Sequence, residues 1–409
     1  MASRSSRLSS YFVRIDVLPE EALRVVMLAL PVDSRARAAC VCRGWRDLLV
    51  DASLWQVLDL TSAGVAAGRV TEDLVRGAVA RAAGHLRVLS YCRPVVWRAR
   101  RSLVAVIESD GAELQQVITD TFLSIGELKR VSAAAPRLQV LSAGVSGECA
   151  ELLPCLRNDP PYGPLRISAV QVLPGRPVSA HGDVLALAAA MAAHESLKGA
   201  KLSMDRTFAP GLNAVLDAAA KQRFTWLCLD EYVDTDAETV PALARLLQRG
   251  SLTKLEVCCD GFPLASHASV LELCAALRAC RALTHLTLFA CPLERAHHRS
   301  VAAVLGAAAA LPALCELSLR GWRVQNTAVF GLALAALLAA NLPSLRSLRV
   351  PDCGLGDDGM APIMFFLEAN THLRELDCGG NNLSEKFVRG CVAPARTALR
   401  GRGGTLRVR

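Results

Sequence analysis

Hydrophobic residues in the second half of the chain recur in a fixed phrase, LxxLxL followed by xx(C/N)xL. Five clear copies begin at Leu252, Leu283, Leu314, Leu345 and Leu373, and two weaker copies begin at Leu197 and Phe224. Successive starts are 27, 28, 31, 31, 31 and 28 residues apart. The stretches between copies, such as "ASHASVLELCAALRAC", place apolar residues at helical spacing. The pattern therefore predicts repeated strand–turn–helix units that stack on one another and share a core.

Side chains alternate along a strand, so the leucines of each phrase point into the core while the third and fifth positions face the concave surface. We extend this rule to the seventh position, at the end of the strand. Interface energy concentrates in a few aromatic and arginine anchors. The candidate target-binding residues at these positions are Trp226, His285, Phe289, Arg320 and Arg349. Trp226 and Phe289 can instead tuck against a neighbouring strand or loop, and the sequence leaves both alternatives open.

The (C/N) residue of each phrase turns the chain out of the strand, where a buried Cys or Asn can bond to the neighbouring backbone. The copies carry Tyr232, Asp260, Cys291, Trp322, Cys353 and Asn381 at this place. Only three of these residues are Cys or Asn, so we expect an incomplete ladder of such bonds. Before residue 197 the phrase survives only in degenerate form, and "PCLRNDPPYGP" carries turn formers that should interrupt the array.

The N-terminal 15–60 segment has a different pattern, which predicts three short helices. Pro19 follows Leu18 and opens the first helix, and Pro31 ends it after Leu30. Asp33 or Ser34 is expected to cap a second helix, whose apolar face includes Cys40, Val41, Trp45 and Leu48. Asp51 is expected to cap a closing turn. A segment of about 45 residues is too small to be very stable alone, so we expect it to depend on a partner for stability.

Composition supports a folded chain. Of 409 residues, 52% are hydrophobic and 21% charged, which is too apolar for disorder. The net charge of +8 is spread along the chain except for a C-terminal run, interpreted as a solvated basic tail: Arg396, Arg400, Arg402, Arg407 and Arg409. Residues 1–14 are expected to be a disordered tail, with a transit peptide as the alternative. The most apolar stretches are shorter than the ~20 residues of a membrane span.

Candidate chemistry changes the picture little. The 15 cysteines include no CxxC pair, which disfavours a zinc site. Several of them recur inside the apolar repeat segments of this long chain, which disfavours a disulfide framework and favours a reducing compartment, the cytoplasm or nucleus. Glu375 and Asp377 face the same way on one predicted strand, as an ordinary pair of solvated carboxylates does. We therefore expect no metal, no cofactor and no catalytic residues. Basic and acidic residues alternate on the predicted concave surface, which disfavours nucleic acid as a partner.

The N-terminal segment resembles the F-box, through "LPEE", "LALP", "VCRGW" and "DASLW" in order. The later phrase similarly resembles leucine-rich repeats of the ribonuclease-inhibitor type. The F-box resemblance implies binding to the Skp-type adaptor of cullin–RING ubiquitin ligases through Leu18, Pro19, Leu30, Pro31, Val41, Cys42, Trp45, Leu54 and Trp55. It places Val41, Cys42 and Trp45 in the core of the second helix. Arg35 and Gly44 depart from the family, which usually has a larger apolar residue and a basic residue there.

The expected fold is therefore α/β, a three-helix F-box followed by a leucine-rich-repeat β/α solenoid shaped as a horseshoe. The expected segments are a tail (1–14), an F-box-like module (15–60), degenerate repeats (61–196), regular repeats (197–390) and a basic tail (391–409). The resemblance implies a non-catalytic substrate adaptor of a ubiquitin ligase, with a protein target on the concave face and no membrane partner. The alternatives are a repeat scaffold not linked to ubiquitination and a helical cap that merely seals the repeats.

Overall fold

The computed structural model divides the chain into two compact units. Unit 1 comprises Met1–Ala143 and Pro164–Arg166, and unit 2 comprises Gly144–Gly163 and Ile167–Arg409. The structure describes residues 18–60, 72–91, 98–157, 159, 167–172, 181–202, 209–229, 238–259, 267–290, 298–322, 324 and 326–408. The predicted tail at residues 1–14 lies outside these ranges.

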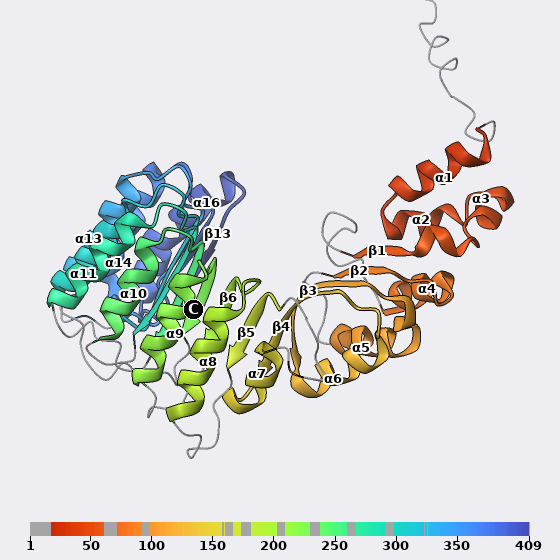
Figure 1. Ribbon diagram of the computed structural model, residues 1–409. Coiled ribbons are helices and arrows are strands. Elements are labelled where there is room, and N and C mark those ends of the chain that lie inside the picture. Colours follow the sequence, from red (N-terminus) through yellow and green to blue (C-terminus); the bar gives the residue numbers. More distant parts are fainter. Residues whose placement is uncertain are drawn as a thin grey trace, which may run out of the picture. The chain divides into compact units, whose positions relative to one another are not determined.

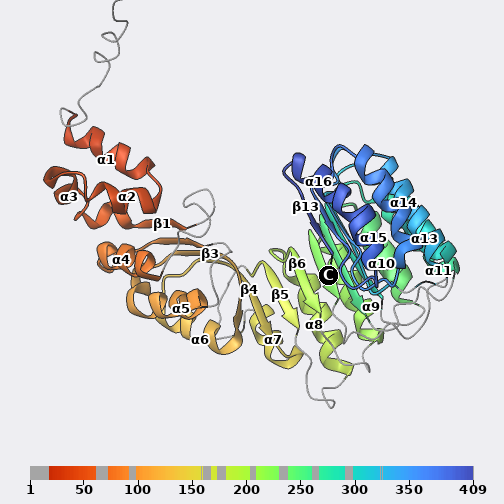
Figure 2. The same cartoon turned by 180° about the vertical axis from the view of Figure 1, so that it is seen from behind.

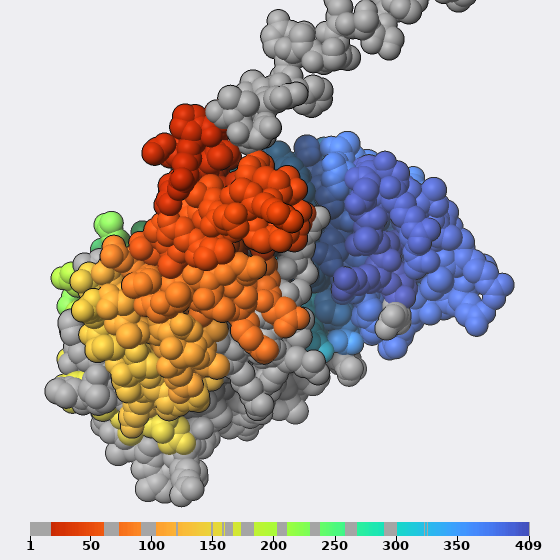
Figure 3. Space-filling model, turned by 90° about the vertical axis from the view of Figure 1, so that its right-hand side faces the viewer, coloured from red at the N-terminus to blue at the C-terminus, as the bar shows by residue number. Residues whose placement is uncertain are grey.

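Unit 1 begins with the helical module, drawn in red and orange in Figures 1 and 3. It contains α1 (Glu20–Ala29), α2 (Val32–Ala38), α3 (Arg43–Leu48) and the turn η2 (Ala52–Trp55). Pro19 and Pro31 precede α1 and α2, and neither helix has a side-chain cap, so the expected capping by Asp33 or Ser34 is wrong. The Asp51 cap is confirmed, because its carboxylate accepts a hydrogen bond from the backbone N–H of Ser53 at 2.9 Å.

The predicted second helix is divided into α2 and α3 by an extended residue, Cys42. Its sulfur accepts a hydrogen bond from the backbone N–H of Trp45 at 3.4 Å, which caps α3. The break turns this region outward: Val41 is 66% exposed and Trp45 only half-buried. The expectation that Val41, Cys42 and Trp45 form a helix core is therefore wrong.

Trp55 is the aromatic core residue of the module. Its side chain is fully buried, and its indole N–H donates to the carbonyl oxygen of Leu49 at 2.9 Å. The guanidinium of Arg35 lies 5.9 Å from the ring centroid, and that of Arg81, on the first repeat helix, lies 5.4 Å away. Cations near a tryptophan ring are attracted to its π face. Trp55 therefore joins the module to the first repeat of unit 1.

Arg35, which departs from the family pattern, is buried in this module. Its guanidinium donates to the backbone oxygens of Leu54 at 2.5 Å, Leu30 at 2.9 Å and Leu28 at 3.4 Å. Burial lowers the pKa of Arg35. The side chain thus fills the place of a larger apolar residue with its stem and satisfies its charged head with carbonyl groups.

The repeats follow in unit 1 with parallel strands in chain order. The elements are β1 (Val57–Leu60), α4 (Glu72–Ala82), β2 (Val88–Tyr91), α5 (Arg98–Asp110), β3 (Gln116–Ser124) and α6 (Ile125–Ala134). In register, Val57 lies beside Val88, and Val88 beside Gln116. The degenerate repeats expected before residue 197 thus form the same strand–helix unit as the clear ones.

Unit 2 continues the pattern, with strands on the inner side of an arc and helices on its outer side (Figures 1 and 2). Its strands are the end of β4 (Val140–Gly147), β5 (Ala169–Val172), β6 (Gly199–Leu202), β7 (Trp226–Leu229), β8 (Lys254–Cys259), β9 (His285–Ala290), β10 (Glu316–Arg320), β11 (Ser347–Arg349), β12 (Glu375–Asp377) and β13 (Thr405–Arg407). All neighbours pair in parallel and in chain order, as predicted.

The helices of unit 2 are α7 (Cys149–Leu156), α8 (His181–Ala193), α9 (Ala209–Lys221), α10 (Thr239–Gln248), α11 (His267–Ala279), α12 (His298–Ala308), α13 (Thr327–Ala339), α14 (Gly356–Ala369), α15 (Glu385–Phe387), η5 (Val388–Val392) and α16 (Ala393–Gly401). None of the described helices combines the length and the hydropathy that a bilayer crossing requires. Strand leucines such as Leu286 and Leu317 are fully buried between sheet and helices.

The predicted basic tail is instead part of the fold. Residues 393–401 form α16, and β13 pairs with β12, so the solvated-tail interpretation is wrong for this stretch. The apolar residues interspersed among the arginines explain the difference, because Val392, Ala395 and Leu399 are buried. Of this run, Arg400 and Arg407 are exposed, whereas Arg402 is partly buried and donates to the carbonyl oxygen of Leu367 at 3.0 Å.

The hydrogen-bond ladder is more complete than its sequence indicates. The indole of Trp322 donates to the carbonyl oxygen of Leu288 at 2.8 Å, and the Cys353 thiol donates to that of Leu319 at 3.2 Å. The Asn381 amide donates to Val350 at 2.8 Å. Three different side chains thus bond in turn to the preceding strand. The other positions, Tyr232, Asp260 and Cys291, lie outside the described residues.

Candidate functional site

The helical module presents an apolar surface to solvent. On α1, Val25 is 67% exposed and Leu28 52% exposed, and Val50 after α3 is more exposed still. Only Met27 of α1 is buried. Since contiguous exposed apolar groups on a soluble protein mark interaction sites, this surface is a candidate for partner binding.

A pocket of about 460 Å³ opens between α1 and α3 of the module. It brings together three of the predicted adaptor-binding residues, Leu18, Cys42 and Trp45. Arg24 and Asp51 form an ion pair at its edge. Hydrogen bonds from Ser53 and from Arg24 lower the pKa of Asp51, so this carboxylate stays charged.

The other predicted adaptor-binding residues divide into two groups. Pro19, Pro31 and Val41 are exposed and Leu30 is partly so, which makes them available to a partner. Leu54 and Trp55 are 2% and 0% exposed. Their side chains hold the module together from inside, so direct contact of either with a partner is excluded while the module stays folded.

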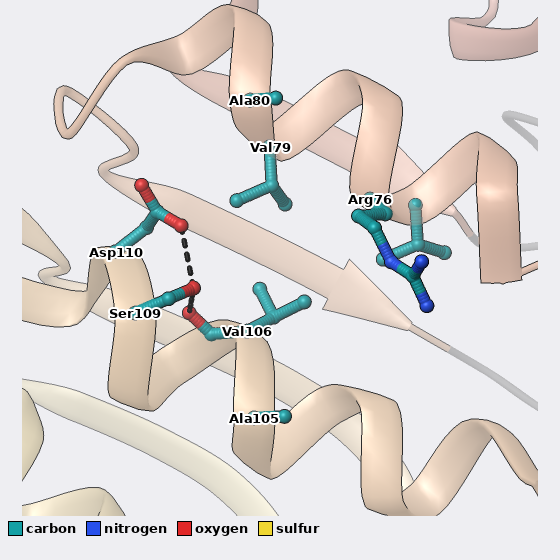
Figure 4. A pocket seen from close by; sticks show the side chains of 8 residues that line it. Arg76, Val79, Ala80, Ala105, Val106, Ser109 and Asp110 are labelled. Carbon is teal, nitrogen blue, oxygen red and sulfur yellow. Dashed lines mark hydrogen bonds between the residues drawn. The ribbon is translucent and has the colours of Figure 1, made fainter.

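A second pocket, of about 290 Å³, lies between α4 and α5 in unit 1 (Figure 4). Val79 and Val106 point into the gap from opposite helices, and Arg76 and Asp110 lie at its two ends. The Ser109 hydroxyl donates to the Val106 carbonyl at 3.1 Å and to Asp110 at 2.6 Å. The lining is mainly aliphatic and offers no pair of groups arranged for acid–base chemistry.

The concave face of unit 2 collects the five predicted target-binding residues on four strands, β7, β9, β10 and β11. Strand register places one residue of each phrase in a row that runs Trp226, Lys254, His285, Glu316. Phe289 and Arg320 lie side by side in a further row. Arg349 lies beside Ser318 in the row between them. The period-two rule thus assigned all five side chains to the correct face.

Trp226 lies across the neighbouring strand. A Cβ atom added to Gly199, its partner in register, would be only 2.1 Å from the indole ring. The glycine therefore makes room for the ring to lie flat on β6, as the tucked alternative anticipated, and Trp226 remains partly exposed. The repeat pattern did not single out Gly199. It occupies the third position of the weak repeat that begins at Leu197, and Trp226 occupies the third position of the next repeat.

Phe289 supports Arg320. The guanidinium of Arg320 lies 5.6 Å from the centre of the Phe289 ring, within the range of a cation–π contact. Its Nε also lies 3.4 Å from a carboxylate oxygen of Asp352, and both side chains of this ion pair are largely exposed. The arrangement fixes an arginine at the edge of the concave face while leaving it accessible.

Arg349 is held between two carboxylates. It lies 2.9 Å from Glu316 and 3.2 Å from Glu375, and the Ser347 hydroxyl also donates to Glu375 at 3.0 Å. Partial burial opposes ionisation of Glu375, but these hydrogen bonds outweigh it and lower the pKa of Glu375. The charges of this cluster are satisfied internally.

Metal chemistry finds no support in the described part of the chain. There, no group of three or more His, Cys, Asp or Glu side chains is arranged to hold a metal ion. What the two surfaces offer is apolar contact area and fixed charges, which are the means of protein–protein recognition.

One part of this organisation matches a known family. Residues 15–61 match the F-box-like family. No curated protein matches the chain in sequence. Among solved structures, the chain is similar to the leucine-rich repeat-containing protein LegL7 from Legionella pneumophila, at 13% identity and a TM-score of 0.40, covering 77% of this chain and 98% of that one. The chain thus joins an F-box-like domain to parallel β/α units carrying the leucine-rich-repeat phrase, an arrangement typical of protein-interaction adaptors.

Proposed function

We propose that the chain is the substrate-recognition adaptor of a cullin–RING ubiquitin ligase. Residues 15–60 bind a Skp-family adaptor, and the concave face of unit 2 binds the protein to be ubiquitinated. The observation that carries the proposal is the apolar surface of an F-box-like module, with Val25 and Leu28 exposed and Leu18 and Trp45 lining a pocket beside them.

In this role the chain needs no catalytic group of its own. Holding a target lysine near a ubiquitin-loaded enzyme raises the effective concentration of the two reactants, and the partners perform the chemistry. The proposal places the chain in the cytoplasm or nucleus. A repeat scaffold without a ligase is the alternative, and adaptor binding separates the two.

Adaptor binding is tested with purified full-length chain and a purified Skp-family protein. Deletion of residues 15–60 should abolish capture. Val25→Asp and Leu28→Asp together should weaken it at least tenfold, because each places a charge on apolar contact area. Pro19→Ala should weaken it while the module stays folded. Leu185→Asp, at an exposed leucine of α8 in unit 2, is the matched control and should bind normally. Undiminished capture by the deletion variant would refute the proposal.

Target binding is tested by affinity purification with mass spectrometry, followed by binding measurements on the proteins found. Trp226→Ala and Phe289→Ala should each weaken capture by about 1–3 kcal/mol. Arg320→Glu should affect an acidic or phosphorylated target more than a neutral one. Full binding by the Trp226→Ala, Phe289→Ala double variant, with an unchanged melting temperature, would show that the target sits elsewhere.

A further inference from the structure

The helices α9 and α10 pack side by side on the outer side of unit 2 (Figure 1). Asp217 of α9 and Arg245 of α10 join them through a two-point ion pair, with N–O distances of 2.9 and 3.2 Å. One helical turn further along both helices, the same spacing of 28 residues relates Lys221 to Arg249. An acid and a base thus occupy the first level of this seam, and two bases occupy the second.

Arg223 adds a third cation in a backbone conformation that favours glycine. It follows the end of α9 with φ 53°, and its backbone N–H donates to the carbonyl oxygen of Ala220. Gly250 and Asn341 make the equivalent hydrogen bond after α10 and α13, with φ 69° and 47°. Glycine and asparagine are the usual residues in this left-handed conformation, which disfavours longer side chains. Helix termination therefore gives no reason for an arginine here, and a backbone outlier of this kind points to a function.

The three cations line one pocket of about 560 Å³, together with the Gln248 amide and the Asp217–Arg245 pair. Lys221, Arg223 and Arg249 are all exposed, and none of them forms an ion pair or a side-chain hydrogen bond with a described residue. The hydrogen bond from Arg245 occupies the Asp217 carboxylate and raises the pKa of Arg245. The pocket thus holds three positive charges that no carboxylate of its lining neutralises.

The helix dipole explains this arrangement only in part. Cations are stabilised near the C-terminal end of a helix, which accounts for Lys221 on α9 and Arg249 on α10 taken one at a time. It does not account for their meeting in one pocket without an acid, because like charges repel one another. Nor does it account for Arg223, whose backbone conformation opposes its presence. An anionic ligand accounts for all three.

The donors of the pocket match a phosphate monoester. Such a group carries about −1.5 to −2 charges at pH 7 and three strong acceptor oxygens. The guanidinium groups of Arg223 and Arg249 can each bind phosphate through two N–H donors, and Lys221 adds a point charge. A carboxylate offers one charge and two oxygens to the same three cations. The volume lies in the range of pockets that hold small ligands, so there is room for the residues that carry the phosphate.

A continuous polyanion fits this surface less well. The described residues that line the pocket include no aromatic ring on which a base could stack. Glu238 and Glu272 lie close enough to act on the charge of Arg245, beside Asp217. A nucleic-acid backbone crossing the seam would therefore meet carboxylates next to the cations. The surface favours a single phosphate group carried by a protein.

We propose that the pocket formed by Lys221, Arg223 and Arg249 binds a phosphorylated serine or threonine side chain of a partner protein. The site lies at the C-terminal ends of α9 and α10, apart from the side chains of the concave face assigned above to the target. It makes binding of the partner dependent on phosphorylation. The proposal does not require that the chain belong to a ubiquitin ligase.

Degenerate peptide libraries and the purified full chain test the proposal. One library carries a fixed phosphoserine, and two matched libraries carry serine or glutamate at the same place. The chain should retain the phosphoserine library about tenfold more strongly than either of the others, and Lys221→Met and Arg249→Met should each weaken that retention about tenfold, the effect of losing one hydrogen-bonded charge. Arg278→Met, at an exposed arginine of α11 outside the pocket lining, removes the same charge and is the matched control that should bind normally.

Arg223→Gly is the decisive variant. Glycine relieves the left-handed backbone, so the melting temperature should equal or exceed that of the wild type, while retention of the phosphoserine library falls about tenfold. A purely structural role for Arg223 predicts a lower melting temperature and no selectivity for phosphoserine.

Three results would overturn the proposal. The first is equal retention of the phosphoserine and serine libraries by the wild-type chain, and the second is normal phosphoserine binding by Arg223→Gly. The third is competition by inorganic phosphate or by single-stranded RNA at the concentration at which the phosphopeptides themselves compete. The assay contains no Skp-family protein, so failure of this proposal and failure of the proposed ligase role are separate outcomes.

Discussion

Of the two tryptophans in the helical module, Trp55 is a core residue and Trp45 lies at the surface. Trp55 is fully buried with its N–H satisfied, so Trp55→Ala should destabilise the module by about 3–5 kcal/mol. Trp45 is half-buried at the α1–α3 pocket, so Trp45→Ala should cost clearly less. Hydrogen exchange across residues 18–60 measures both losses, with Leu185→Asp as the control. Equal losses of protection in the two variants would contradict this assignment.

Gly199 and Trp226 should behave as a coupled pair. Gly199→Ala puts a methyl group into the space of the indole ring, so it should lower the free energy of unfolding by about 1–3 kcal/mol. Trp226→Ala removes the obstacle, and the double variant should therefore be more stable than the sum of the single effects predicts. Chemical denaturation of all four proteins measures the coupling. Strict additivity would show that the ring does not depend on the glycine.

Single residues also mark where sequence reasoning stops. The period-two rule placed Trp226, Phe289 and Arg320 on the concave face, because alternation is a property of every strand. It had no means to show that Trp226 lies on Gly199 or that Phe289 supports Arg320, because these contacts join different repeats. Arg35 is a similar case, since its three carbonyl acceptors exist only once the module has folded.

At the scale of the repeat, the donor ladder is the feature to test. Trp322→Phe keeps most of the ring volume and removes the N–H that bonds to the Leu288 carbonyl. The loss of one buried hydrogen bond should cost about 1–3 kcal/mol. Thermal unfolding measures the change, and Phe365→Leu, at an exposed ring, is the control. An unchanged melting temperature for Trp322→Phe would show that the bond contributes little.

Elements were predictable where periodicity is strong and not where it is interrupted. Parallel strands and outer helices follow from seven phrases in phase. The division between α2 and α3 was missed because apolar spacing continues across Cys42, and the break depends on a sulfur cap that propensity does not encode. The hydrogen-bond ladder was underestimated because the indole N–H of Trp322 takes the place of the expected Cys or Asn donor.

On the scale of the whole chain, the C-terminal repeat should act as a cap. β13 covers the edge of β12, and Leu399 of α16 is buried beneath it. Removal of residues 391–409 leaves strand edge and apolar core open to water, and terminal caps are required for soluble repeat arrays. We expect a lower melting temperature and aggregation, measured by light scattering. A soluble truncated chain with unchanged stability would restore the tail interpretation.

At the scale of the whole chain, the basic composition of the C-terminus led to a wrong interpretation of its structure. Five arginines near the C-terminus resemble a solvated tail when they are counted by charge. Their spacing leaves Val392, Ala395 and Leu399 on one helix face, and that periodicity, not the charge, decides the structure. The F-box-like module, by contrast, was found from its motifs alone, because short segments with a fixed order are specific even when one position carries Arg35.

The close packing of α13 against α14 should make some repeats of unit 2 harder to bend than others. A Cβ atom on Gly331 would lie 2.0 Å from the carbonyl oxygen of Gly359, so the two backbones touch without a cushion of side chains. Bending between adjacent repeats must compress or shear whatever lies between their helices, and a packed backbone contact yields very little. We therefore expect this stretch to flex less than repeats whose helices are held apart by longer side chains. A protein bound on β10–β12, as proposed above, would therefore meet a surface that selects by shape instead of adjusting to it.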